Sequence, residues 1–200
     1  MPTPPQAIRL IVGLGNPGRE YTATRHNAGA CWVRQIAGQH GAGWNTEKTF
    51  FGETARLHLP DGGSVWLLLP TTYMNRSGQA VQALASFYKI SPAAILVAHD
   101  ELDLLPGILK LKLGGGHAGH NGLRDIDAQL GTRDYWRLRI GIGHPRSLNL
   151  SQNVADFVLS RPDAKDQHSI ESALNKALNI LPSLLAGHFA QAAETVHKPG

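Results

Sequence analysis

The chain has 200 residues, one cysteine and a formal net charge of +4 at pH 7. A single cysteine excludes an internal disulfide framework, and the longest apolar runs are far too short to cross a membrane. The length predicts one domain with a sizeable core, and the positive charge mildly favours a nucleic-acid or phosphate-bearing partner. We expect a soluble cytoplasmic domain over residues 1–200, with a loose tail at residues 1–7.

The first predicted element is a buried strand over residues 8–12, a short apolar run ended by glycine. A glycine-rich turn over residues 13–18 follows it, and a polar segment then leads to His26. A helix is expected over residues 27–40. Polar groups therefore flank the carboxyl end of a buried strand, which is the edge where open α/β sheets bind ligands.

The turn also matches the dinucleotide fingerprint G-x-G-x-x-G, in Gly13-Leu-Gly-Asn-Pro-Gly18. That fingerprint needs a helix opening at the turn and an acidic residue about 20 residues later. Residues 20–25 have no apolar helical face, and the next acid after Glu20 is Glu47. We therefore expect the glycines to turn the backbone sharply and expose Asn16, with the dinucleotide site as a less favoured alternative.

The remaining pattern alternates strands and helices. In chain order we expect a loop at residues 41–49, a hairpin at 53–59 and 64–69, a helix at 77–89, and strands at 94–100 and 108–113. A helix at 123–130 and a strand at 136–142 follow. From about residue 163 the chain should be helical, with a break or kink at Pro182 and an interruption at Gly187. The order predicts an α/β fold, with a single-domain twisted mixed sheet covered by helices on both faces.

Five polar clusters lie at strand ends or in neighbouring loops: Asn16, residues 25–27, Asn75, Asp100, and residues 120–121. Each alone has a structural explanation as a turn or cap. Together they suggest a chemistry, because a histidine oriented by a carboxylate can take a proton from water and asparagine amides can stabilise an oxyanion. This pattern is typical of ester hydrolysis by activated water.

A metal centre is the main alternative chemistry. His117 and His120 lie three residues apart and could join His26 and Asp100 around zinc, but no H-E-x-x-H helix is present. The glycine-rich loop over residues 114–122 could instead bind phosphate through backbone N–H groups, although it lacks the lysine and hydroxyl of a P-loop. We expect no metal and no cofactor.

Two predicted strands carry alternating cations. Lys110 and Lys112 alternate with leucines, and Arg137 and Arg139 repeat the pattern. Alternation places each pair on one strand face. Periodicity alone leaves two possibilities, a solvated strand face and a phosphate-binding face.

Six segments in this order resemble the bacterial-type peptidyl-tRNA hydrolases. The segments are Val12-Gly-Leu-Gly-Asn-Pro-Gly18, Tyr21-Thr-Ala-Thr-Arg-His-Asn-Ala-Gly29, Pro70-Thr-Thr-Tyr-Met-Asn-Arg-Ser-Gly78, His99-Asp-Glu-Leu-Asp103, Gly114-Gly-Gly-His-Ala-Gly-His-Asn-Gly122 and Arg137-Leu-Arg-Ile-Gly-Ile-Gly-His-Pro145. The resemblance covers Ile8 to about Pro145, and the C-terminal helices fit more loosely.

The resemblance implies a monomeric, metal-independent esterase that releases peptides from tRNA, with no membrane or DNA partner. It implies that His26 is the general base, that Asp100 holds it, and that Asn16 senses the peptide-like group beside the ester. The residues implied to contact the substrate end are Tyr21, Tyr73, Asn75 and Asn121, and those implied to bind a tRNA phosphate are Lys112 and Arg139. A non-catalytic RNA-binding protein on the same scaffold is the alternative function.

Overall fold

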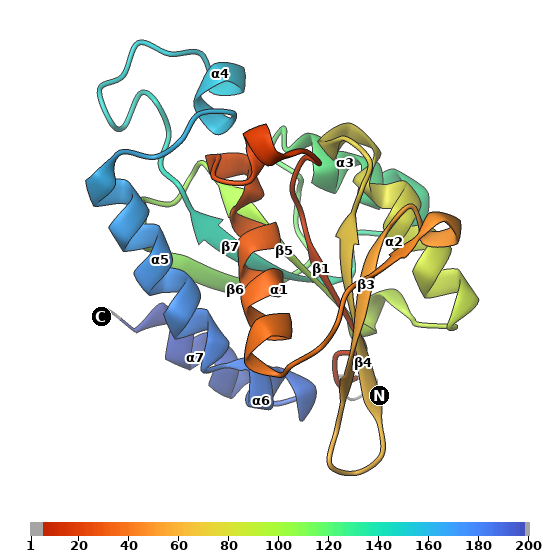
Figure 1. Ribbon diagram of the computed structural model, residues 1–200. Coiled ribbons are helices and arrows are strands. Elements are labelled where there is room, and N and C mark those ends of the chain that lie inside the picture. Colours follow the sequence, from red (N-terminus) through yellow and green to blue (C-terminus); the bar gives the residue numbers. More distant parts are fainter. Residues whose placement is uncertain (1–5, 199–200) are drawn as a thin grey trace.

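The computed structural model describes residues 6–198, and all its strands belong to one sheet in the order β2-β3-β4-β1-β5-β7-β6 (Figure 1). The strands are β1 Leu10–Gly13, β2 Asn45–Glu47, β3 Gly52–His58, β4 Ser64–Pro70, β5 Ile95–Glu101, β6 Leu109–Leu113 and β7 Trp136–Gly141. Strand β1 pairs in parallel with β4 and β5, and β5 pairs in parallel with β7. The pairs β2–β3, β3–β4 and β6–β7 are antiparallel, so the predicted mixed sheet is confirmed.

Helices cover both faces of this sheet (Figure 1). They are α1 Ala28–Gln39, α2 Ser77–Phe87, α3 Asn121–Leu130, α4 Val154–Val158, α5 Ala164–Leu178, α6 Leu181–Leu185 and α7 Phe189–His197. Helices α1 and α4 to α7 bury apolar residues in one core, and α2 and α3 bury theirs in a second core on the opposite face. Two-sided burial explains why every residue of β1 and β5 is buried and why these strands read as apolar runs without alternation.

The start of α1 lies unusually close to the central strands. A Cβ added to Gly29 would come within 2.0 Å of the carbonyl oxygen of Ala98 in β5, so only glycine fits there. The helix begins at Ala28, far beyond the glycine turn, and a short 3-10 helix at Arg19–Tyr21 follows Gly18 instead. The glycines therefore serve a turn and close packing, and the helix that a dinucleotide fingerprint requires is missing from this place.

One local prediction was wrong. Residues 41–49 were expected to form a loop, but they contain β2, which pairs with the edge of β3. The expected break at Pro182 is confirmed, because α5 ends at Leu178 and Pro182 stands in the first turn of the separate helix α6, where proline costs no hydrogen bond. The five-residue helix α4 was not predicted at all. Most of the expected N-terminal tail lies outside the described residues. Among residues 6–198, no helix combines the length and hydropathy needed to span a bilayer.

Candidate active site

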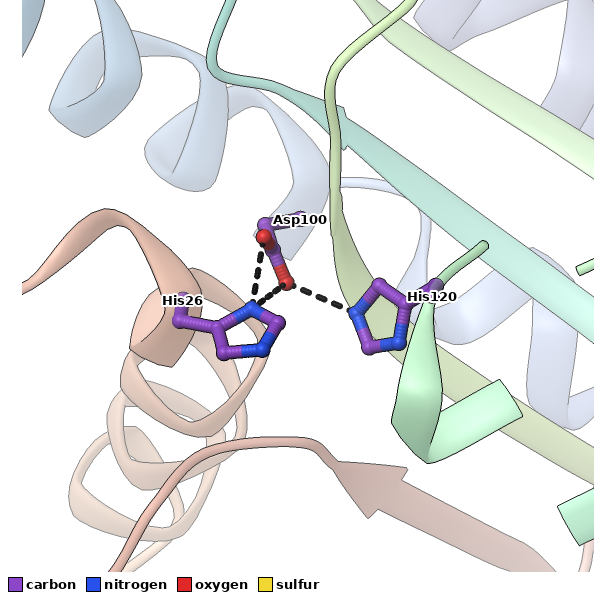
Figure 2. Close-up of side chains that lie close together, drawn as sticks. All are labelled: His26, Asp100 and His120. Carbon is purple, nitrogen blue, oxygen red and sulfur yellow. Dashed lines mark hydrogen bonds and ion pairs between the residues drawn. The ribbon is translucent and has the colours of Figure 1, made fainter. Parts of the chain in front are cut away.

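The centre of the site is the hydrogen-bonded pair of His26 and Asp100 (Figure 2). Asp100 lies near the carboxyl end of β5, and His26 lies in the 3-10 helix η2, Arg25–Asn27, directly before α1. Nδ1 of His26 lies 3.0 Å and 2.8 Å from the two carboxylate oxygens of Asp100. The fold therefore brings the predicted histidine and carboxylate together, and Nε2 of His26 points away from the carboxylate.

A second histidine, His120, holds the same carboxylate from the other side. Its Nε2 lies 2.9 Å from Oδ1 of Asp100. Its Nδ1 accepts hydrogen bonds from the backbone N–H groups of Gly122 and Leu123, at 3.2 Å and 3.4 Å, and so caps α3. A neutral imidazole that accepts at Nδ1 carries its proton on Nε2. His120 therefore donates to Asp100 and keeps no nitrogen free for proton transfer.

These contacts set the charges of the pair. Burial alone would lower the pKa of His26, but the charge of Asp100 and its hydrogen bond outweigh burial and raise it. Burial would raise the pKa of Asp100, but the electrostatic attraction of the facing histidines, His26 and His120, and the hydrogen bonds to them hold it far below its usual range. Asp100 is thus an anion at neutral pH, and it makes His26 a stronger base than an ordinary histidine.

His26, Asp100 and His120 offer three ligand atoms within 4.8 Å of one another, as a metal centre would. A metal ion needs the lone pairs of both histidine nitrogens that face Asp100. His120 has no lone pair there, because capping α3 fixes its proton on Nε2. The donor set therefore suits a hydrogen-bonded carboxylate better than zinc.

The three side chains open onto a cavity of about 460 Å³, which we call the central cavity. Asn121, an exposed residue at the start of α3, lines the same space. The apolar part of the lining comes from Leu102, Ala118 and the α4 residues Val154, Ala155 and Val158. A cavity whose wall combines apolar and polar side chains can hold a ligand and fix its polar groups.

Asn16 lies in a neighbouring cavity of about 300 Å³, which also contains Asn27. The side chain of Asn27 accepts a hydrogen bond from the backbone N–H of Asn16 at 2.9 Å and donates one to its carbonyl at 3.0 Å. Oδ1 of Asn16 accepts from the backbone N–H of Met74 at 2.8 Å. Asn27 directly follows His26, so the turn that carries His26 also fixes the position of Asn16.

The other residues implied to contact substrate are more exposed. Tyr73 is 62% exposed, Asn75 lies beside it in an exposed turn, and Tyr21 is half-buried at the end of a 3-10 helix. None of the three lines either of the two cavities described above. Of the four residues implied to contact substrate, the structure groups only Asn121 with His26.

The four alternating cations of β6 and β7 share one face of the sheet, which we call the basic strand face: Lys110, Lys112, Arg137 and Arg139. The strand register sets Lys110 opposite Arg139 and Lys112 opposite Arg137. Lys112 and Arg139 line a small cavity of about 60 Å³ beside the glycine-rich loop, which we call the glycine-loop cavity. Arg137 lines it too, but is only 2% exposed, so a solvated strand face, one of the two possibilities left open by the periodicity, does not describe Arg137.

Sequence reasoning missed the role of His120. His120 was expected only as part of a polar cluster and as a possible metal ligand with His117. In the structure it directly precedes α3, and a side chain at that position caps backbone N–H groups. Asn27 was likewise expected only as part of a polar cluster, and its two hydrogen bonds to Asn16 cross a turn that sequence spacing does not define.

Comparisons with known proteins identify the same family along nearly the whole chain. Residues 10–200 match the model of the peptidyl-tRNA hydrolase family. The chain is 56% identical over 192 residues to a peptidyl-tRNA hydrolase of Bordetella avium, covering 96% of this chain and 92% of the relative. It is 55% identical over 190 residues to one of Neisseria meningitidis, with coverages of 95% and 97%.

Solved structures give the same result. A crystal structure of peptidyl-tRNA hydrolase from Acinetobacter baumannii matches with a TM-score of 0.89 and 47% identity, covering 95% of this chain and 94% of that chain. A crystal structure of a peptidyl-tRNA hydrolase in complex with n-propanol matches with a TM-score of 0.90 and 46% identity, with coverages of 96% and 97%.

Proposed function

The chain belongs to the peptidyl-tRNA hydrolase family, and on that premise we propose that His26 activates the water that cleaves the ester between a peptide and its tRNA. The observation that carries this proposal is the hydrogen bond from His26 Nδ1 to Asp100 at 2.8 Å. It places the proton of neutral His26 on Nδ1 and leaves Nε2 as a base.

The chemistry then needs no covalent intermediate with the protein. Nε2 of His26 takes a proton from water as the water oxygen bonds to the ester carbonyl carbon. The carbonyl oxygen becomes an oxyanion, and an amide N–H donor such as that of Asn121 can stabilise it. The bond to the ribose oxygen of tRNA breaks, and protonated His26 returns its proton to that oxygen. The products are the free peptide and a tRNA with a free terminal hydroxyl.

His120 acts as a positioning residue in this scheme. It does not receive the proton, because its two nitrogens bind Asp100 and the start of α3. By fixing one oxygen of Asp100 it fixes the direction in which Asp100 holds His26. A correctly oriented base within a rigid frame lowers the barrier without any motion of the site during the reaction.

Selection for peptides is assigned to Asn16. We propose that its amide binds the peptide group next to the ester, which an unblocked aminoacyl-tRNA replaces with an ammonium group. The support is that Asn27 clamps its backbone next to His26. We propose further substrate contacts for Tyr21, Tyr73, Asn75 and Asn121. The last three are exposed and Tyr21 is half-buried, so a large ligand can reach their side chains.

Lys112 and Arg139 are proposed to bind a tRNA phosphate. Both line the glycine-loop cavity, and among residues 6–198 no carboxylate forms an ion pair with Lys112. The two residues lie on neighbouring strands. The ammonium group of Lys112 can bind a phosphate as a point charge, and the planar guanidinium group of Arg139 can donate two parallel hydrogen bonds to it. We propose that the protein works as a monomer in the cytoplasm, where its substrate forms, and that residues 1–200 act as one domain around the single sheet.

The second candidate function is that of a non-catalytic RNA-binding protein. Measuring whether the protein hydrolyses its substrate distinguishes this candidate from the hydrolase. The test is hydrolysis of an N-acetylated aminoacyl-tRNA beside its unblocked form. We expect rapid hydrolysis of the acetylated substrate and at least about tenfold slower hydrolysis of the unblocked one, because one lost hydrogen bond to the partly buried Asn16 is worth about that factor. Binding of both without hydrolysis of either would support the second candidate.

A further inference from the structure

The basic strand face adjoins one carboxylate that the proposed reaction does not use, that of Glu101. Glu101 follows Asp100 on β5, and strand alternation sends the two side chains to opposite faces of the sheet. Asp100 faces His26, whereas Oε1 of Glu101 lies 3.2 Å from Nη2 of Arg139 on the neighbouring strand β7. Glu101 lines both the central cavity and the glycine-loop cavity, so it stands between the two sites.

The two arginines of β7 are held in different ways. Arg137 donates to the carbonyl of Gly116 at 2.8 Å, forms an ion pair with Asp127 on α3 at 3.3 Å, and is buried, so it is a fixed part of the structure. Arg139 has Glu101 as its ion-pair partner, and its side chain remains 23% exposed. An incoming anion can therefore reach Arg139 but not Arg137.

A phosphate that binds Arg139 has to compete with Glu101. The side chain of Glu101 is only 9% exposed, so a displaced carboxylate would remain poorly solvated and without its cation. If both anions shared the guanidinium group, they would repel each other at close range. In either case Glu101 makes the binding of phosphate to Arg139 less favourable.

We propose that Glu101 is a release residue, which neutralises Arg139 in the free enzyme and weakens the hold on a tRNA phosphate so that deacylated tRNA leaves after hydrolysis. This inference rests on the proposed phosphate contacts of Lys112 and Arg139. It assigns Glu101 a role in product affinity and none in the bond-breaking step, although it is the chain neighbour of Asp100.

The experiment compares deacylated tRNA binding to the unmodified protein and to Glu101→Gln. Glutamine keeps the size of the side chain and removes its charge. We expect about three- to tenfold tighter binding near ~0.1 M salt, the range for one partly buried charge interaction. The slope of log affinity against log salt should steepen by about one unit, because one more cation becomes available to phosphate.

Two further variants make the result specific. Glu194→Gln changes the net charge equally, but Glu194 pairs with Lys198 on α7, which covers the opposite face, so tRNA affinity should not change. In an Arg139→Ala background, Glu101→Gln should no longer tighten binding, because the two residues act on one contact. If Glu101→Gln does not fold, Glu101→Asp withdraws the carboxylate by one methylene group and should tighten binding by a smaller factor.

Unchanged or weaker tRNA binding by folded Glu101→Gln would overturn the inference, since Glu101 would then orient Arg139 for phosphate. The phosphate contacts proposed for Lys112 and Arg139 and the release role proposed for Glu101 can be refuted independently. If Arg139→Ala and Lys112→Ala both leave tRNA affinity intact, the phosphate contacts themselves are wrong. If those variants weaken binding and Glu101→Gln does not tighten it, only the release role is wrong.

Discussion

The two faces of β5 hold charge in opposite ways. On the face toward α1, the side chain of Asp100 is 2% exposed and two histidines bind it. On the other face, three of the four cations of the basic strand face are open to solvent: Lys110 and Lys112 are exposed, and Arg139, which shares one ion pair with Glu101, is partly exposed. The fourth, Arg137, is buried and paired. The first arrangement is closed and fully paired, and the second is open and exchangeable.

This difference fits the roles proposed for the two faces. A base must keep one orientation while charge develops on the substrate, which favours buried and mutually satisfied partners. A phosphate contact must form and dissolve in every cycle, which favours exposed cations whose interactions salt can screen. Changes on the α1 face should therefore alter the rate of bond breaking, and changes on the basic strand face should alter tRNA affinity.

The largest effect should come from Asp100→Asn. Asparagine has one acceptor oxygen and an NH₂ group that would face the N–H of a histidine, so His26 loses its tautomer and its orientation. We expect kcat to fall by roughly two to four decades with little change in KM. Single-turnover and steady-state hydrolysis of an N-acetylated aminoacyl-tRNA would measure both constants. A fall of less than tenfold would contradict the closed, fully paired arrangement.

The same variant should shift the pH dependence. His26 acts as a base only when neutral, and Asp100 raises its pKa above the ordinary value. In the unmodified protein kcat/KM should therefore rise with pH and level off above about 6.5, the ordinary pKa of histidine. In Asp100→Asn the burial that remains lowers the pKa, so the midpoint should move to lower pH. A shift to higher pH would contradict the assignment.

A smaller effect is expected for His120→Ala. Asp100 would lose one of its two donors and α3 its cap, so the base would be less well oriented. We expect roughly a tenfold loss in kcat with KM nearly unchanged, since a positioning hydrogen bond is worth about that factor. His58→Ala, at the exposed end of β3, is the matched control. A loss as large as that of Asp100→Asn would mean that His120 itself transfers a proton.

On the basic strand face, Lys112→Ala should raise KM for full-length tRNA by about five- to tenfold at low salt, because one phosphate contact is removed. Its effect should vanish at high salt. A short fragment, with only the terminal nucleotides and a peptidyl ester, should be hydrolysed at the normal rate. Lys165→Ala on α5 is the control for loss of one positive charge. Equal losses on fragment and full tRNA would show that the two faces do not act separately.

The smallest expected effect is that of chelation. Exhaustive removal of metal ions should leave hydrolysis by the His26–Asp100 pair unchanged, because the capping role of His120 keeps a proton on the nitrogen that a metal would need. Activity measured before and after dialysis against a strong chelator tests this. Loss of activity that zinc restores would replace the general-base mechanism with a metal-bound hydroxide.

Sequence predicted the sheet and its two covered faces because those depend on local patterns. Apolar runs without alternation identified β1 and β5 as buried strands, and alternation identified β6 as a strand with one polar face. The family resemblance predicted that His26 pairs with Asp100. The positions of the two residues at strand ends are consistent with this pairing but do not predict it by themselves.

The remaining features depend on contacts between distant segments. Arg137 and Arg139 follow the same alternation, and only the place of Asp127 on α3 decides that Arg137 is buried and fixed. The cap that sets the tautomer of His120 depends on the precise start of α3, which pattern reading placed two residues too late. Helix α4 is too short to show helical periodicity. The part of the central cavity that α4 lines could therefore not be predicted from the sequence.

The central claim, that His26 is the base, is tested most directly by single-turnover hydrolysis of N-acetylated aminoacyl-tRNA with His26→Ala in excess over substrate. Excess enzyme makes the observed rate report bond breaking rather than affinity. We predict a rate about two to four decades below that of the unmodified protein, the usual contribution of a general base, with deacylated tRNA bound equally well by both. A His26→Ala variant that cleaves the ester at a near-normal rate would contradict the mechanism.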